Sequence, residues 1–498
     1  MPSAGLRAPL GTSFEAAAAR IGVSAYAARI ALITAIGLAL RVLWVGHEPI
    51  WRDEAFTAIV AQRDIPGMLQ AIRLDSAPPL SYLITHVFVV MLGASPAALR
   101  VAPAIIGALL IPIVAALTRR CAGDRAGIVA AFICALAPAL VMSSRDARMY
   151  AMATTLVALS SLALWRASER SSALRWTVYG AALLLALYTQ YFALLVIPAQ
   201  LLALRLVLRA SWRAVALASA VAALCVAALV PWLAYAAPQF QHAESPFWVQ
   251  PLGLTTTAGT FAQFLAGPPI EPGTPGGVYL LVLQGFSLLA ATVVTMLLIR
   301  RRPIWSRPAI FIAVCGAVPI AELAAVSLWH PLLEARYASV VWGVLFGVLA
   351  LAVAAIRRVR MQVLLVLTLV VPTAGFSVAV THPNTPALVS YLEPRLQAND
   401  FVWSSAGDYL LLYYSGDAAL RAHTHVVAHH IAWFWGTAAF PPDAVTPTFP
   451  SRTIEGGGTI YYVDDAGHKL PNPPSRYALS RYQCYGTICL ATYTAGAG

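Results

Sequence analysis

Three carboxylates lie close together in the sequence, just after the first long hydrophobic segment. Asp53 and Glu54 are adjacent, and Asp75 follows in the same stretch. Ionised carboxylates beside a membrane are costly unless they are solvated, paired or bound to a cation, so the group favours a polar cavity. Asp53 also lies beside Trp51, where partial burial and a neighbouring carboxylate can tune it as a general base. The alternative is that these are solvated loop residues paired with nearby arginines such as Arg52.

A second polar group lies at the start of a later hydrophobic segment and contains Arg145, Asp146, Arg148 and Tyr150. The spacing of the two arginines lets them share one face of a helix. Two guanidiniums at this position need an anionic partner. That partner is either a carboxylate, Asp146 or Asp53, or the phosphate of a ligand.

Arg336 and Tyr337 stand together after Trp329-His330-Pro331, at the start of another hydrophobic segment. A single arginine at a membrane interface is either an anchor whose charged end reaches the water or a contact for a ligand. The sequence leaves both interpretations open.

The composition identifies the chain as a membrane protein. It is 59% hydrophobic and 11% charged over 498 residues, whereas soluble domains contain roughly 45–50% apolar residues. The net charge of +12 would suit a nucleic-acid partner. However, the basic residues are scattered singly and in short clusters, without a basic face interleaved with aromatic residues, so no nucleic-acid partner is expected.

A helix needs about 20 apolar residues to cross a bilayer, and on that basis we predict an all-α polytopic protein with about eleven transmembrane helices. These are expected near 28–46, 98–118, 126–143, 148–165, 175–190, 192–209, 214–236, 277–299, 309–328, 337–356 and 361–380. The apolar stretch 79–93 is shorter and follows two prolines. It is either a short crossing or a helix that lies along the interface.

The distribution of arginines decides between these two. Short cytoplasmic loops collect Arg and Lys, and five arginine clusters near residues 119–125, 166–175, 205–213, 300–307 and 357–360 occupy alternate loops. All five lie on one side only if 79–93 does not cross, so we predict an interfacial helix there. The outer loops are then 47–97 and 237–276. The outer face includes Asp53, Asp75, Asp146, Arg148, Gln190, Tyr191 and Arg336.

The chain divides into three parts. Residues 1–27 form a cytoplasmic segment, 28–381 form the transmembrane module, and 382–498 form a small extracytoplasmic α/β domain. In the last part we expect helices at 386–396 and 408–414, and strands at 401–404, near 459–463 and within 477–493. Cys484 and Cys489 could close a disulfide there if the compartment is oxidising.

Five motifs, taken in order, resemble the bacterial GT-C glycosyltransferases often labelled family 39, the relatives of protein O-mannosyltransferases and of the lipid A aminoarabinose transferase. The motifs are the acidic pair at 53–54, Asp75-x-x-Pro78-Pro79-Leu80-x-Tyr82, the segment from Ser144 to Tyr150, Leu187-Tyr188-Thr189-Gln190-Tyr191-Phe192, and Arg336-Tyr337. The resemblance covers residues 28 to 380. It implies transfer of a sugar from a polyprenyl-phosphate carrier to a lipid, glycan or protein acceptor outside the cytoplasmic membrane.

The resemblance also implies roles for individual residues. Asp53 matches the presumed base that deprotonates the acceptor hydroxyl, and Glu54 and Asp75 support it or help to bind a divalent cation, Mg²⁺ or Mn²⁺, with Asp53 and Asp75 as ligands. The candidates for binding the carrier phosphate or the rest of the substrate are Arg52, Arg145, Asp146, Arg148, Tyr150, Gln190, Tyr191, Arg336 and Tyr337. A single displacement would invert the anomeric centre.

Two positions differ from many of these relatives, which carry His where this chain has Ala77 and Gln190, so the metal stays open. The alternative function is a transporter or flippase for a lipid or sugar-lipid of the cell envelope, with carboxylates that carry protons. The clustering of ionisable residues at one face, and not at the bilayer midplane, favours the enzyme. We expect a multi-pass protein of the inner (plasma) membrane with its active site outside.

Overall fold

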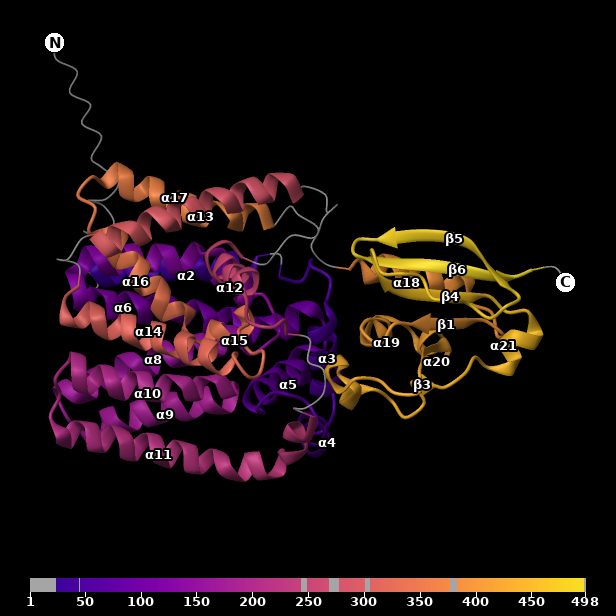
Figure 1. Cartoon of the computed structure of the whole chain (residues 1–498), viewed down its shortest axis with the longest axis horizontal. Helices are drawn as coiled ribbons and strands as arrows, with labels where there is room; N and C mark the ends of the chain where they lie inside the picture. The colour runs from indigo at the N-terminus through magenta and orange to yellow at the C-terminus, as the bar shows by residue number, and fades with distance from the viewer. Residues whose placement is uncertain are drawn as a thin grey trace, which may run out of the picture.

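The computed structural model describes residues 24–43, 45–242, 249–267, 277–300, 305–376 and 383–496. Most of the predicted segment 1–27, parts of the predicted outer loop 237–276 and the predicted boundary at 381–382 lie outside these residues. The described chain forms a bundle of long helices, and a smaller domain that contains a β-sheet lies at one end of this bundle (Figure 1). The predicted fold class is confirmed.

The bundle consists of apolar helices that lie side by side along one direction (Figure 1). The long ones are α2 (Ala25–Val42), α6 (Pro96–Leu136), α8 (Tyr150–Glu169), α9 (Ala173–Thr189), α11 (Trp212–Tyr235), α13 (Gly277–Arg300), α14 (Arg307–Val326), α16 (Trp342–Ala354) and α17 (Val359–Phe376). Shorter helical pieces are α7 (Pro138–Ser144), α10 (Val196–Leu202) and α15 (Ala335–Ala338). Runs of Ala, Leu and Val favour helices here because, in hydrocarbon, only a helix satisfies its own backbone groups.

Helix α6 covers the predicted crossing 98–118 and, together with α7, the predicted crossing 126–143. Its backbone leaves the helical region at Ala122 and Gly123, where Gly123 has a φ of 77°, a value that glycine adopts without a steric cost. The two halves then run back along each other, since Gly127 lies against the carbonyl of Ala115. The second half ends before Pro138, whose ring cannot continue the helix.

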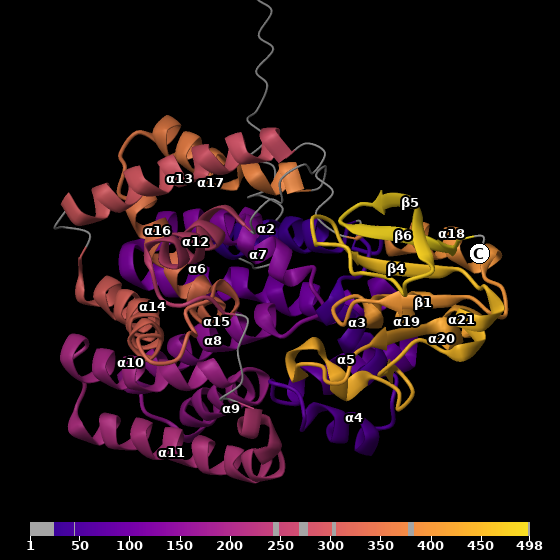
Figure 2. The same ribbon diagram turned by 45° about the vertical axis from the view of Figure 1, so that its right-hand side comes forward.

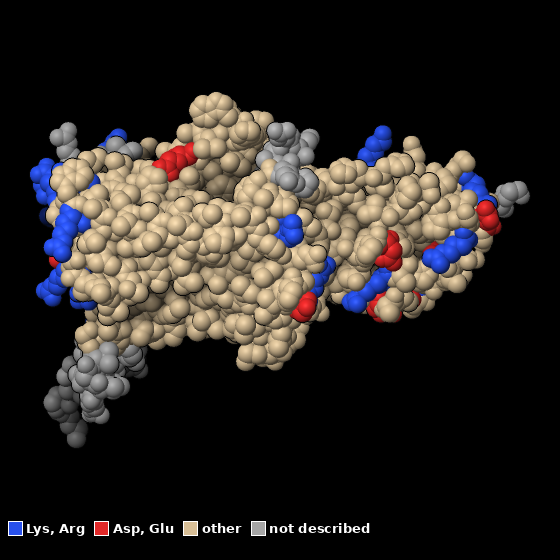
Figure 3. All heavy atoms as spheres, turned by 90° about the horizontal axis from the view of Figure 1, so that it is seen from below, with Lys and Arg blue, Asp and Glu red and all other residues tan. Residues whose placement is uncertain are grey.

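Five helices in the described ranges are long and apolar enough to cross a membrane, and others are apolar but shorter. The predicted number of crossings therefore stays a prediction. Figure 3 shows that Lys and Arg side chains gather at the end of the bundle remote from the sheet domain, and that a broad, largely uncharged surface follows. This arrangement is the one expected when the predicted cytoplasmic clusters share one side.

Three short helices, α3 (Arg52–Ala61), α4 (Ile65–Ile72) and α5 (Leu80–Leu92), connect α2 to α6 at the end of the bundle that faces the sheet domain (Figures 1 and 2). The stretch predicted to be an interfacial helix is α5, which has 13 residues and is thus shorter than the ~20 that a crossing needs. Its position at the interface stays a prediction. Helix α12 (Leu254–Ala266) lies in the other predicted outer loop.

The C-terminal domain contains a six-stranded mixed sheet in the order β3-β2-β1-β4-β6-β5. The strands are β1 (Phe401–Ser404), β2 (Thr424–Val427), β3 (Val445–Thr446), β4 (Ile460–Asp465), β5 (Tyr477–Tyr485) and β6 (Ile488–Ala495). Strands β1 to β4 pair in parallel, and β6 pairs antiparallel with both β4 and β5. The helices are α18 (Thr385–Leu392), α19 (Tyr409–Ser415), α20 (Ala418–His423) and α21 (Ser451–Gly456).

The sequence pattern predicted β1, β4, α18, α19 and the strands within 477–493, whereas β2, β3, α20 and α21 were not predicted. Strands β2 and β3 have only 4 and 2 residues, too few for an alternating pattern to stand out. Cys484 and Cys489 form a disulfide across the β5–β6 turn. One hydrophobic core cluster contains residues of both α3 and α19, so the two parts of the chain share buried side chains.

Candidate functional site

Helix α3 carries the acidic pair in its first turn, with Trp51 as the extended residue before it. The N-terminal end of a helix stabilises negative charge because its first backbone N–H groups have no partner within the helix. The two carboxylates nevertheless point to different surroundings. Successive residues of a helix are about 100° apart around its axis, so adjacent side chains leave in different directions.

Glu54 is buried and bound on all sides. Arg100 of α6 donates from Nε to Oε1 at 2.6 Å and from Nη2 to Oε2, and both side chains are 1% exposed. The backbone N–H of Ala147 donates to Oε1 at 2.9 Å. The remaining Arg100 N–H groups donate to the carbonyls of Val45, Glu48 and Pro49. We therefore assign Glu54 a positioning role that joins α3, α6 and the segment before α8.

Asp53 keeps an accessible carboxylate, with 32% of its side chain exposed. Its Oδ2 atom lies 3.3 Å from Nη1 of Arg336 and 3.9 Å from Nε of Arg148. The structure thus brings together three predicted site residues from three distant segments. An accessible carboxylate between two guanidiniums can accept a proton while an anion is held nearby.

Arg148 links this carboxylate to Asp75 through a chain of hydrogen bonds. Its Nη1 donates to the hydroxyl of Tyr82 at 2.9 Å and to Oγ1 of Thr57 at 3.3 Å. The hydroxyl of Tyr82 in turn donates to Oδ2 of Asp75 at 2.9 Å. The pKa of Asp75 is raised above its usual value because the effect of burial is the largest. Arg148 and the Tyr82 hydroxyl act in the opposite direction and lower it.

A cavity of about 340 Å³ lies next to Arg336, which is one of its lining residues. Its volume is within the size range of small-molecule sites. Charged and polar residues that line it include Glu48, Trp51, Arg145, Asp146, Tyr150, Gln263, Glu334 and Arg336. The guanidinium of Arg336 lies 5.2 Å from the centre of the Trp51 ring, so this arginine reaches both the cavity and Asp53. Asp53 and Arg148 themselves are not among the lining residues.

The other guanidinium in the cavity belongs to Arg145. Its Nη2 atom lies 3.3 Å from Oε1 of Glu48 and donates to the carbonyl of Leu43 at 3.0 Å. The carboxylate partner of Arg145 is therefore Glu48, and not Asp146 or Asp53 as the sequence suggested. Asp146 accepts a hydrogen bond from Nε1 of Trp51 at 3.2 Å, and burial together with Glu54 raises its pKa to about 8.

The remaining predicted binding residues are not among those that line the cavity; they are Gln190, Tyr191, Tyr337 and Arg52. The hydroxyl of Tyr191 donates to Gln239 at 2.9 Å and accepts from Trp232 at 2.8 Å. The Gln190 side chain lies 3.5 Å from the carbonyl oxygen of Arg336. The ring of Tyr337 stacks on Phe192, with centroids 4.4 Å apart. Arg52 points to the C-terminal domain, where it pairs with Asp408 and Asp465.

Three residues that line the cavity were not predicted from the sequence, namely Arg100, Gln263 and Glu334. Arg100 carried a signal, because a lone arginine at the start of an apolar crossing needs a buried partner. Gln263 and Glu334 carried none, since single polar residues in outer loops are ordinary. They join the site only because α12 and the segment before α15 fold over it.

The expected divalent cation stays a prediction. Within the described ranges, no group of three or more His, Cys, Asp or Glu side chains is placed to hold a metal ion. Asp53 and Asp75 are linked through the guanidinium of Arg148, and a cation would compete with that positive charge. No step is therefore assigned to a metal.

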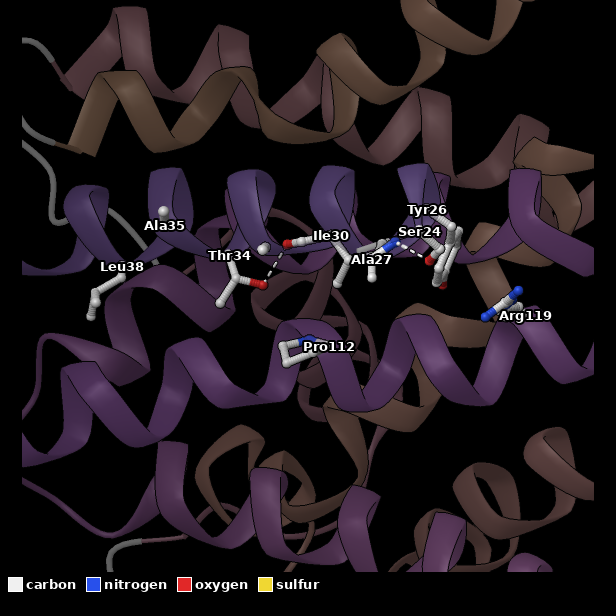
Figure 4. Close-up of a pocket in the computed structure, with 10 residues that line it drawn as sticks. Ser24, Tyr26, Ala27, Ile30, Thr34, Ala35, Leu38, Pro112 and Arg119 are labelled. Atoms are coloured by element: carbon white, nitrogen blue, oxygen red, sulfur yellow. Dashed lines mark hydrogen bonds between the residues drawn. The ribbon is translucent and has the colours of Figure 1, made fainter. Parts of the chain in front are cut away.

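A second hollow, of about 580 Å³, runs along α2 and the first half of α6 (Figure 4). Its lining is mainly apolar, from Tyr26, Ile30 and Leu38 to Pro112. Within it, Thr34 donates only to the carbonyl of Ile30 in its own helix. None of the predicted site residues lines this hollow.

Comparison with known proteins found similarity to one family model. The family model described as dolichyl-phosphate-mannose-protein mannosyltransferase matches residues 76–235. Among curated proteins, none matches the chain in sequence.

Three solved structures share the fold. ArnT from Cupriavidus metallidurans in the apo state is 14% identical, with a TM-score of 0.64 over 94% of this chain and 98% of that one. The same protein bound to undecaprenyl phosphate is 13% identical, with a TM-score of 0.62 over 93% and 97%. The oligosaccharyltransferase of Archaeoglobus fulgidus tethered with an acceptor peptide is 14% identical, with a TM-score of 0.51 over 88% and 69%.

Proposed function

We infer that the chain, which has the fold of ArnT and is related to the protein mannosyltransferases of the GT-C superfamily, is a membrane glycosyltransferase that uses a polyprenyl-phosphate sugar. The family match at 76–235 contains Tyr82, Arg145, Arg148 and Tyr191. The solved structure of ArnT with undecaprenyl phosphate supports a carrier of this kind. The acceptor is a hydroxyl of a lipid, a glycan or a protein.

One observation carries the proposal: Arg336 contacts Asp53 at 3.3 Å and also lines the cavity that contains Arg145. A base for the acceptor and a binding site for the departing phosphate are thereby adjacent. Guanidiniums bind phosphate oxygens with paired hydrogen bonds. We assign the phosphate to Arg145 and Arg336, and assign Arg148 to the alignment of Asp53.

The reaction is a single displacement at the anomeric carbon of the sugar. The acceptor oxygen forms a bond to that carbon as the bond from the carbon to the phosphate oxygen breaks. Asp53 takes the proton of the acceptor hydroxyl, and the leaving polyprenyl phosphate keeps the electron pair. The arginines stabilise the charge that grows on the phosphate, and attack from the opposite face inverts the anomeric centre.

The test is transfer by the purified full chain in lipid vesicles that contain radiolabelled polyprenyl-phosphate sugars. Asp53→Asn should abolish transfer and leave the protein folded. Asp64→Asn is the matched control, since Asp64 is an exposed cap of α4. Transfer by Asp53→Asn at the wild-type rate would refute the assignment of the base. Movement of the labelled lipid across the vesicle membrane without transfer of its sugar would instead support the alternative function, a lipid or sugar-lipid transporter.

A further inference from the structure

Arg52, the residue next to the proposed base, points away from the cavity and into the C-terminal domain. Its Nε atom lies 3.4 Å from Oδ1 of Asp408, and its Nη2 atom contacts Asp465. Its guanidinium also lies 5.5 Å from the centre of the Trp435 ring. Asp408 and Asp465 are separated from Arg52 by most of the sequence, so this contact exists only in the folded chain.

The C-terminal domain is shaped to receive this guanidinium. The Asp408 side chain is fully buried and accepts a hydrogen bond from Ser405 at 2.8 Å. Beside it stands Gly407, where an added Cβ would lie 3.1 Å from Cζ of Arg52. A larger residue at that position would require the Arg52 guanidinium or the Trp435 ring to shift by a few tenths of an ångström. A buried carboxylate with a paired guanidinium is costly to separate.

The other end of α3 is held in the same way. Arg63, two residues beyond the helix, donates to the carbonyls of Ala438 and Ala439 at 3.3 Å and 3.2 Å. Between the two arginines, Phe56 packs against Gly436, where an added Cβ would lie 2.9 Å from its ring. The C-terminal domain therefore contacts α3 at its start, along its length and past its end.

We propose that the C-terminal domain is part of the catalytic unit because it fixes α3, and that Arg52 is the positioning residue through which it sets the place of Asp53. This proposal rests on the proposed function. Displacement of a catalytic group by about 1 Å can cost about 10²-fold in rate. The contacts that hold the two ends of α3 should therefore affect the turnover rate directly. Arg52 touches neither the donor cavity nor the phosphate site.

The experiment compares Arg52→Gln, the double variant Asp408→Asn/Asp465→Asn, and the triple variant, each in the full chain. We expect kcat to fall by about 10- to 100-fold, while KM for the polyprenyl-phosphate sugar stays within about 3-fold, because the phosphate site is untouched. Residues in one network do not add, so the triple variant should be no slower than the slower of the other two. Arg481→Gln is the control, since Arg481 lies on the remote strand β5 and bonds Tyr391.

A failure of the positioning role of Arg52 can be told apart from a failure of the proposed function. If the wild-type chain transfers no sugar, the function is wrong. If Asp53→Asn is inactive while Arg52→Gln turns over like the wild type, the positioning role is wrong and the function stands. Fully additive losses in the triple variant, or a rise in KM with kcat unchanged, would also overturn it. Should the double variant not fold, the kcat of the single variant Asp465→Asn is measured in its place. This variant should fold, because Asp465 is 27% exposed and the Asp408 contact remains.

Discussion

Arg100 donates hydrogen bonds to both carboxylate oxygens of Glu54, and both side chains are 1% exposed. The neighbouring Asp53 is 32% exposed and faces two other arginines. Two acidic residues that are equivalent in the sequence thus have separate roles. Glu54 fixes the start of α3 between two transmembrane segments, and Asp53 is left accessible for the proton transfer that we propose.

The buried pair predicts a large loss of stability on Arg100→Ala. Removal of one partner of a buried ion pair typically costs about 3–5 kcal/mol, because the other charge stays buried without compensation. The unfolding temperature of the purified protein in detergent should fall clearly. Arg119→Ala is the matched control, since Arg119 pairs with Asp124 where both are about half exposed and such pairs contribute about 0–1 kcal/mol. Similar unfolding temperatures for the two variants would contradict the structural role of Arg100.

Asp146 predicts a fall in stability with rising pH. Its pKa is raised to about 8 in the folded chain, above the unfolded value of about 3.9, so the folded state binds the proton more tightly. Stability is then greatest below the unfolded pKa and declines as pH rises through the folded one. Asp146→Asn should flatten the dependence of the unfolding temperature on pH between 5 and 9. An unchanged slope in this variant would count against the raised pKa.

Tyr82→Phe should lower activity and change its dependence on pH. The variant removes the hydroxyl between Arg148 and Asp75, and with it a hydrogen bond that lowers the pKa of Asp75. If Arg148 is aligned by ionised Asp75, the acidic limb of kcat should move to higher pH, and kcat should fall by about 10-fold. Tyr391→Phe, in the C-terminal domain, is the control. A lower kcat with an unmoved acidic limb would show that the hydroxyl acts only on packing.

Arg336→Lys should lower kcat/KM by about 10²- to 10³-fold, because a lysine cannot make the paired contacts of a guanidinium to a phosphate and a carboxylate. The measurement is the transfer rate at several concentrations of the polyprenyl-phosphate sugar. The same exchange at Arg358, an exposed residue near the start of α17, should leave the rate unchanged. Equal kinetics for Arg336→Lys and the wild type would remove Arg336 from the phosphate site.

The amino-acid sequence by itself determined the membrane class, the division into a helical module and a small α/β domain, and the set of charged residues from which the site is built. These follow from composition and from local patterns. A hydrophobic segment of sufficient length becomes a membrane helix wherever its neighbours lie, and an unpaired charge beside such a segment is rare enough to indicate a role.

The tertiary structure alone decided how those charges are paired. Arg52 was expected at the substrate, but it pairs with Asp408, 356 residues away. Glu54 and Asp53 leave α3 in different directions and meet different partners, and Gln263 reaches the cavity because α12 folds over it. Side-chain direction and long-range contact depend on how whole helices pack, and no spacing along the chain contains that information.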